Sequence, residues 1–178
     1  KLEMLQKACT FIRSFGNPVT VESLFKAYVA FQSAFGSQTG QANFRADADF
    51  DGDGDIDFQD YFGFRTAFGT LPLPADQQKQ FEAYTKAYEL FKPALQDGLT
   101  AEEMLAIAEA VFNAGGSVSG DPGFVEAHDV DSSGAITTAD SIQVYLAGIL
   151  LMDAAERQKL EMLQKAVTFI RSFGNPVT

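Results

Sequence analysis

Residues 49–60 read DFDGDGDIDFQD, and this stretch decides how the rest of the chain is interpreted. Aspartates stand at positions 1, 3, 5, 7, 9 and 12 of the stretch, with glycine at position 6 and isoleucine at position 8. A hard cation such as calcium takes roughly six to eight oxygens, and a loop that binds it turns sharply at a glycine and adds the carbonyl of position 7. The stretch therefore predicts a calcium loop. Its expected ligands are Asp49, Asp51, Asp53, Asp55 through its carbonyl, Asp57 and Asp60.

A second loop with the same plan occupies residues 129–140, DVDSSGAITTAD. Gly134 and Ile136 keep positions 6 and 8, whereas hydroxyls replace carboxylates at positions 5 and 9. Because both loops offer only oxygen ligands, the sequence predicts two calcium ions and argues against transition metals. The ligands expected in the second loop are Asp129, Asp131, Ser133, the carbonyl of Ala135, Thr137 and Asp140.

Both stretches resemble the EF-hand loop, with the difference that Asp60 and Asp140 close them in place of glutamate. With this closing residue they are similar to dockerin-type and related bacterial extracellular calcium loops. The resemblance covers each loop and the start of the helix after it, and it implies calcium binding. Dockerins read cohesin with the pair of residues before the closing position. Those pairs, 58–59 and 138–139, differ in kind here, so only the calcium chemistry carries over.

The two loops belong to a repeat of 80 residues, which continues without a gap from Thr20 and Thr100 to Ala67 and Ala147. Apolar residues at helical spacing, with glycines and capping residues at the ends, predict helix–helix–loop–helix in each copy. The sequence thus predicts an all-α fold of two related units plus a terminal helix. The expected divisions are 1–74 with its loop 49–60, 75–158 with its loop 129–140, and 159–178.

The expected helices cover about 1–15, 20–36 and 58–69 in the first unit, and about 76–92, 100–115 and 138–151 in the second. The many phenylalanines recur at helical spacing and are expected in the core. In paired EF-hand motifs the position-8 residues form a short antiparallel bridge, and we therefore expect Ile56 to pair with Ile136.

Residues 159–178 nearly repeat residues 1–20, and the only difference is Val167 in place of Cys9. Asp153 and Glu156 form a capping-box pattern, which places the start of the last helix near Ala154. We interpret 159–178 as the start of a following repeat in a tandem array. Its apolar stripe is expected to join molecules head to tail. The stripe consists of Leu160, Leu163, Val167, Ile170 and Phe173.

The composition argues against several other classes of protein. A net charge of −11 disfavours nucleic acid and anionic membranes as partners, and no apolar run is long enough to span a membrane. The single histidine, His128, is expected to face solvent, and the single cysteine, Cys9, to be a small buried hydrophobe. No catalytic constellation is recognisable, so we do not expect an enzyme.

Taken together, these features predict a calcium-binding structural repeat from an extracellular or cell-surface fibre, adhesin or surface protein. Calcium would stiffen the array. Two alternatives remain at this point. The duplicated segment would also suit an engineered calcium switch, in which two copies compete for one docking place. A dockerin-like module that binds a protein or glycan partner would show an exposed apolar or aromatic patch outside the core.

Overall fold

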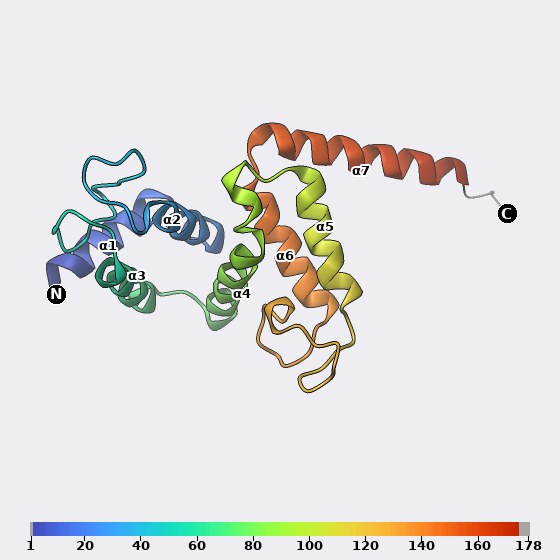
Figure 1. The fold of residues 1–178 in the computed structure, drawn as a ribbon, viewed down its shortest axis with the longest axis horizontal. Helices are drawn as coiled ribbons and strands as arrows, with labels where there is room; N and C mark the ends of the chain where they lie inside the picture. The colour runs from blue at the N-terminus through green and yellow to red at the C-terminus, as the bar shows by residue number, and fades with distance from the viewer. Residues whose placement is uncertain (1, 175–178) are drawn as a thin grey trace. The chain divides into compact units, whose positions relative to one another are not determined.

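The computed structural model describes the backbone of residues 2–174 and the side chains of residues 2–168, and this part of the chain is all-helical (Figure 1). The all-α prediction is therefore confirmed. Two isolated β-bridges, Gln38 with Asp55 and Val118 with Ala135, are the only extended pairing among the described residues. The α-helices are α1 (Leu2–Ser14), α2 (Val21–Ala34), α3 (Phe58–Thr70), α4 (Ala75–Phe91), α5 (Ala101–Asn113), α6 (Thr138–Leu151) and α7 (Ala154–Gly174), with short 3-10 turns η1 (Ala94–Gln96) and η2 (Glu126–His128).

The chain forms two compact units, Lys1–Phe81 and Glu82–Thr178, and their boundary falls inside α4. The sequence placed this boundary before α4, between residues 74 and 75. The difference has a packing cause, because the first turns of α4 carry Phe81 into the first unit. Its ring centroid lies 4.7 Å from that of Phe68 and 6.0 Å from that of Tyr28.

Side-chain caps mark the starts of α2, α3, α5 and α6. Thr20 and Thr100 accept the backbone N–H three residues later at 3.2 Å and begin α2 and α5. Asp57 and Thr137, at position 9 of the two loops, cap α3 and α6 by accepting the backbone N–H two residues later. Each cap satisfies an N–H group that has no partner inside its helix, so each loop is joined directly to the helix that follows it.

The first unit is built around phenylalanines, as the helical spacing predicts. Phe50, from the loop, packs within a ring-centroid distance of 5.6 Å from Phe11 on α1 and 5.8 Å from Phe31 on α2. Phe64 on α3 lies 5.6 Å from Phe31. A loop residue thus stands among residues of α1, α2 and α3 in one core.

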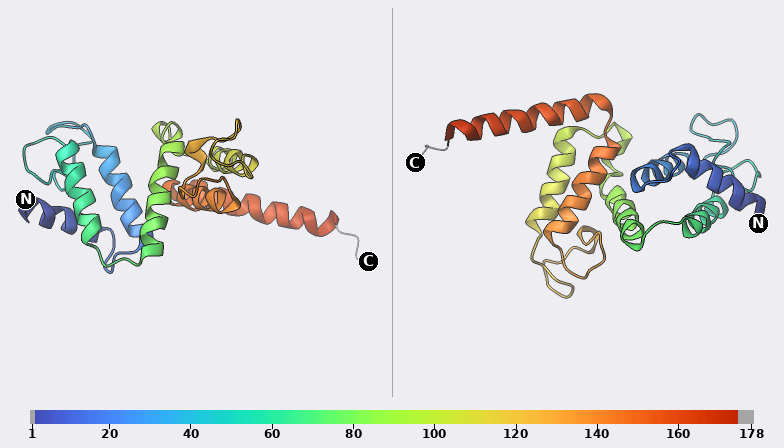
Figure 2. Two further views of the ribbon diagram at one scale, coloured as in Figure 1. Left: turned by 90° about the horizontal axis from the view of Figure 1, so that it is seen from below. Right: turned by 180° about the vertical axis from the view of Figure 1, so that it is seen from behind.

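The second unit centres on α5 and α6, which lie side by side (Figures 1 and 2). Gly148 on α6 makes this close approach possible. A Cβ added there would lie 2.9 Å from the ring of Phe91 on α4 and would clash with Met104 on α5. Both of those side chains are buried.

The last helix begins at Ala154, as the sequence predicts, and it packs on α5. Leu160 is buried, and Lys159 forms an ion pair with Glu102 at 2.8 Å. Asp153 accepts the N–H of Glu156 at 2.9 Å, but the carboxylate of Glu156 bonds to the N–H of Ala101 rather than completing a capping box.

The remainder of α7 extends beyond α5 and α6 (Figure 1). Within the described part of the chain, no helix combines the length and the apolar character that crossing a membrane requires.

Candidate metal centre

Three carboxylates of the first loop converge on one point. Asp49, Asp51 and Asp60 each place an oxygen within 4.8 Å of the others. The loop folds around Asp49, whose two oxygens accept the N–H groups of Gly52 at 2.7 Å and Gly54 at 3.1 Å. Both glycines have a positive φ, which side-chain-bearing residues rarely adopt. The glycines therefore allow the backbone to curl around the first ligand.

The closing residue of this loop, Asp60, lies buried beneath it. One of its oxygens accepts the N–H groups of Phe50 at 2.6 Å and Asp51 at 3.3 Å, and the other accepts the N–H of Asp57 at 3.0 Å. Asp60 thus joins the beginning of the loop to the first turn of α3, and a cation bound there would strengthen that connection.

The charges in the first loop work against one another. Burial is the main cause that raises the pKa of Asp60, and it outweighs the N–H groups that the carboxylate accepts. The pKa of Asp51 is raised by desolvation and by the charges of Asp60, Asp53 and Asp49. The pKa of Asp55 is raised by desolvation and then by the neighbouring aspartates. A divalent cation would relieve this repulsion, since it favours the ionised form of every ligand.

The second loop has the same geometry with fewer carboxylates. Asp129, Asp131 and Asp140 each place an oxygen within 4.8 Å of the others, and Asp129 and Asp140 are buried. Asp129 accepts the N–H groups of Ser133 and Gly134, both at 2.9 Å. Asp140 accepts the N–H of Asp131 at 3.2 Å and that of Thr137 at 2.8 Å. Two sequences that differ at most loop positions therefore form the same acidic cluster.

The structure brings together positions 1, 3 and 12 of each loop and gives the other expected ligands local partners. In the first loop, Asp53 accepts the N–H of Asp55 at 3.1 Å, and Asp57 accepts the N–H of Gln59 at 2.6 Å as the cap of α3. One carboxylate oxygen of Asp55 is buried and has no hydrogen-bond partner among the described residues.

Hydroxyl groups take the corresponding places in the second loop. Ser133 donates to the carbonyl of Ala135 at 3.0 Å, and Thr137 donates to Asp140 at 3.1 Å. Both hydroxyls lie within the loop that carries the acidic cluster, where they would be available to a bound ion after a rotation of the side chain.

The position-8 isoleucines pair inside their own units. The N–H of Ile56 donates to the carbonyl of Ser37 at 2.9 Å, and its carbonyl accepts the N–H of Gly36 at 2.8 Å. Ile136 bonds in the same way to Ser117 and Gly116, both at 2.9 Å. The backbone groups that a bridge would need are thus already used, and the expected pairing of Ile56 with Ile136 is wrong.

A lysine from an earlier helix, α1 or α4, lies against each loop, and the sequence did not lead us to expect this contact. Nζ of Lys86 on α4 donates to the carbonyl of Asp129 at 3.2 Å and to Oγ of Ser132 at 2.5 Å. Nζ of Lys7 on α1 lies 3.4 Å from where a Cβ would stand at Gly52. The signal was present, because LEMLQKACTFI at 2–12 and FEAYTKAYELF at 81–91 match with a spacing of 79 and align these lysines.

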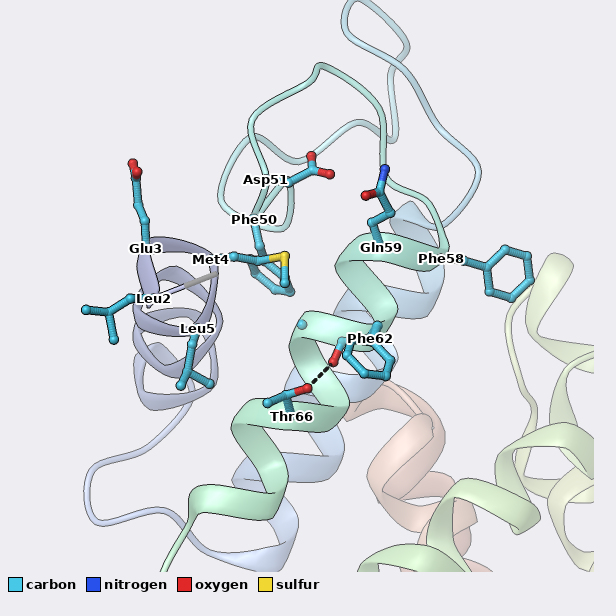
Figure 3. Close-up of a pocket in the computed structure, with 11 residues that line it drawn as sticks. Leu2, Glu3, Met4, Leu5, Phe50, Asp51, Phe58, Gln59, Phe62 and Thr66 are labelled. Carbon is cyan, nitrogen blue, oxygen red and sulfur yellow. Dashed lines mark hydrogen bonds between the residues drawn. The ribbon is translucent and has the colours of Figure 1, made fainter.

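An apolar groove opens beside the first loop, between α1 and α3. It has a volume of about 860 Å³, and Figure 3 shows the side chains that line it. Leu2, Phe58 and Phe62 are among the residues that border it, and each is 69–75% exposed. The sequence assigned phenylalanines to the core, and for Phe58 and Phe62 this assignment is wrong. We call these three residues the exposed patch.

The two residues considered for other chemistry have ordinary surroundings. Cys9 is partly exposed rather than buried, and its Sγ lies 3.9 Å from Oγ1 of Thr70. His128 is partly buried rather than facing solvent, and its Nδ1 is a buried atom with no hydrogen-bond partner among the described residues. Neither belongs to a group that could hold a metal.

Comparison with known proteins gives no assignment. No family model, no curated protein and no solved structure matches the chain.

Proposed function

We propose that the chain is a calcium-binding structural repeat of an extracellular fibre, adhesin or surface protein. One observation carries this proposal. Two units with different loop sequences form the same cluster of three aspartates at the same loop positions, directly ahead of a helix. Aspartates that served only as solvated surface charges would not be expected to converge on one point inside each loop.

The donor set favours calcium over other common metals. Only oxygen atoms converge in the two clusters, which suits calcium, magnesium or manganese and disfavours zinc or copper. The loops are irregular and offer backbone carbonyls and further carboxylates around each cluster. Calcium accepts such variable coordination, whereas magnesium needs near-ideal octahedral geometry and retains its waters.

In this proposal calcium acts as a structural clamp. Each cluster combines ligands from the beginning and the end of a loop, and the last ligand belongs to the first turn of α3 or α6. An ion would therefore fix the helix to the loop. Calcium concentrations near millimolar outside cells would fill even weak sites of this kind, which is why we place the protein outside the cell or on its surface. Repeats would then join head to tail into an array.

Calorimetry with buried closing residues replaced would test the proposal. Asp60→Asn and Asp140→Asn keep the size of the side chain and remove one charge from each cluster. Each variant is expected to lose one of two calcium-binding events. Asp97→Asn, an exposed carboxylate outside both loops, is the matched control and should bind as the wild type does. Two intact binding events in the double variant would contradict the proposal.

A second function, calcium-dependent binding of a protein or glycan partner, is favoured by the exposed patch. Such a module needs apolar surface outside the core, and Leu2, Phe58 and Phe62 supply it beside the first loop. A dye that fluoresces on apolar surfaces should bind the wild type. It should bind less to a variant with Phe58→Ser and Phe62→Ser. Phe112→Ser, which removes an exposed phenylalanine of the second unit, is the control. Equal fluorescence of all three proteins would argue against this function.

A further inference from the structure

One apolar sequence occupies two different environments in this chain. LEMLQKACTFIRS forms α1, and the same thirteen residues with valine for cysteine recur inside α7. In α1, Ala8 and Ile12 are completely buried, and Leu5 and Cys9 beside them are partly buried. In α7 the described part of the same face lies in solvent, with Leu163 exposed by 39% and Val167 by 47%. Ile170 and Phe173 lie outside the described side chains.

The structure shows what surface fits this face, because α1 is docked on it. Met4 packs at Gly63, where an added Cβ would lie 3.3 Å from its Cγ. Phe11 packs against Phe50 and Phe64, with ring-centroid distances of 5.6 and 6.5 Å. Cys9 faces Thr70 on α3 at 3.9 Å. We call this surface, Phe50, Gly63, Phe64 and Thr70, the α1 seat.

The residue that differs between the copies does not obstruct the fit. Val167 replaces Cys9, and both are small apolar side chains of similar volume. Cys9 is only partly buried, which leaves room for the extra methyl group. The face of α7 therefore carries the side chains that the α1 seat already accepts.

The two ends of α4 pack in different units, and α7 begins in a similar way. The beginning of α4 places Phe81 in the first unit, and its end places Phe91 beside Gly148 in the second. The beginning of α7 likewise buries Leu160 on α5, at the position that matches Phe81. The later part of α7 therefore corresponds to the end of α4, which carries Phe91 and packs in the unit that follows Phe81.

A lysine supports this correspondence. Lys7 and Lys86 lie against the backbone of the loop in their own units. Lys165 takes the equivalent place on α7 and is exposed. It would meet the backbone at Gly52 in any first unit on which α7 docked.

We propose that the exposed face of α7 docks in the α1 seat of a second copy of this chain and displaces α1 there. This inference deepens the head-to-tail joining in the proposed function and rests on that part of it, but it does not depend on calcium. Because the donor helix and the seat belong to opposite ends of the chain, the contact is heterologous and adds one molecule after another.

Competition with α1 sets the conditions for observing this contact. The resident α1 is tethered to its seat by a short connection, which gives it an effective concentration on the order of millimolar. Exchange should therefore require concentrated protein, and refolding a concentrated sample should allow both helices to compete for each empty seat.

Disulfide trapping tests the contact directly. A variant with Cys9→Val, Thr70→Cys and Val167→Cys has one thiol in the seat and one on α7. After refolding at about millimolar concentration and oxidation, it should form covalent multimers that a reductant dissolves. Thr70→Cys alone pairs with the native Cys9 and should give an oxidised monomer. Moving the α7 thiol one residue, to Thr168→Cys, should abolish the multimers. Monomers from the trapping variant would overturn the proposal.

Sedimentation equilibrium tests it without a cross-link. Ile12→Ala removes a buried side chain from α1 but leaves α7 unchanged, so the associated fraction should rise by about tenfold or more. Adding Leu163→Asp and Val167→Asp should return the protein to monomer. Association that survives these two substitutions would mean that another surface is responsible, and would overturn the proposal.

Calorimetry on the same samples separates this inference from the proposed function. Calcium binding without trapped multimers would refute the docking of α7 and leave the calcium-binding role intact. Trapped multimers without calcium binding would refute the calcium role and support the docking.

Discussion

The buried carboxylate of Asp60 accepts the backbone N–H of Phe50 at 2.6 Å, so the last residue of the first loop is tied to its second residue. Phe50 is itself part of the core of the first unit. This contact uses a ligand oxygen without needing an ion. It therefore predicts how each unit behaves when calcium is removed.

Removing calcium should loosen the protein without unfolding it completely. The backbone N–H groups that Asp60 accepts and the phenylalanine core remain after chelation, but the extra link between each loop and its helix is lost. An ion that binds only the native state stabilises it by about 2.7 kcal/mol at 100 times its Kd. We expect a partial loss of far-UV circular dichroism and a lower Tm in chelator. Identical melting curves with calcium and with chelator would contradict this.

The calcium-free protein should lose stability as the pH rises. The folded-state pKa values of Asp51 and Asp60 lie above the ordinary value of 3.8. Their stabilising contribution to the free energy of unfolding is therefore fully present below the ordinary pKa. It is lost as the pH rises through the raised pKa. Lowered pKa values at Glu102 and Glu103 act in the opposite direction. The comparison must therefore be made with a variant that changes the loop alone.

Asp60→Asn provides that comparison. In chelator, the wild type should lose Tm relative to this variant between about pH 4 and pH 7. With calcium the order should reverse at neutral pH, because the ion needs the ionised carboxylate. Parallel curves of Tm against pH for the two proteins in chelator would show that folding does not raise the pKa of Asp60.

The loops and the helix starts could be predicted from sequence because local chemistry determines them. Spaced aspartates around Gly54 identify the first loop, and Thr100 with Glu103 identifies the start of α5. These signals involve residues only a few positions apart. Tertiary packing does not disturb them.

The backbone partner of Ile56 is distant in the sequence, and hydrophobic periodicity does not determine which distant residue it is. A bridge to Ile136 would satisfy its N–H and carbonyl, and so does the pairing that the chain uses, with the carbonyl of Ser37 and the N–H of Gly36. Gly36 and Gly40 recur as Gly116 and Gly120, all with positive φ, and this repeated turn was the available signal. The role of α4 was missed for a related reason, since its match to α1 has a spacing of 79 while the loops repeat at 80.

The first loop should bind calcium more tightly than the second. It offers five carboxylates at the side-chain ligand positions 1, 3, 5, 9 and 12, whereas Ser133 and Thr137 reduce this number to three in the second loop. Affinity in such loops increases with the charge of the ligand set. Calorimetry should resolve two unequal sites, with Asp49→Ala removing the tighter one and Asp129→Ala the weaker. Loss of the weaker site in Asp49→Ala would reverse the ranking.

Two glycine substitutions should have opposite effects on stability. In Gly148→Ala the new methyl group would meet Phe91 at 2.9 Å and would also clash with Met104, so the free energy of unfolding should fall by about 1–3 kcal/mol. Gly69, in α3, has nothing within 4 Å of an added Cβ and is exposed. Gly69→Ala should therefore raise the free energy of unfolding by about 0.5–1 kcal/mol, because alanine loses less backbone entropy in a helix. Urea unfolding followed by circular dichroism in saturating calcium measures both. A Gly148→Ala protein as stable as Gly69→Ala would mean that α5 and α6 do not meet at Gly148.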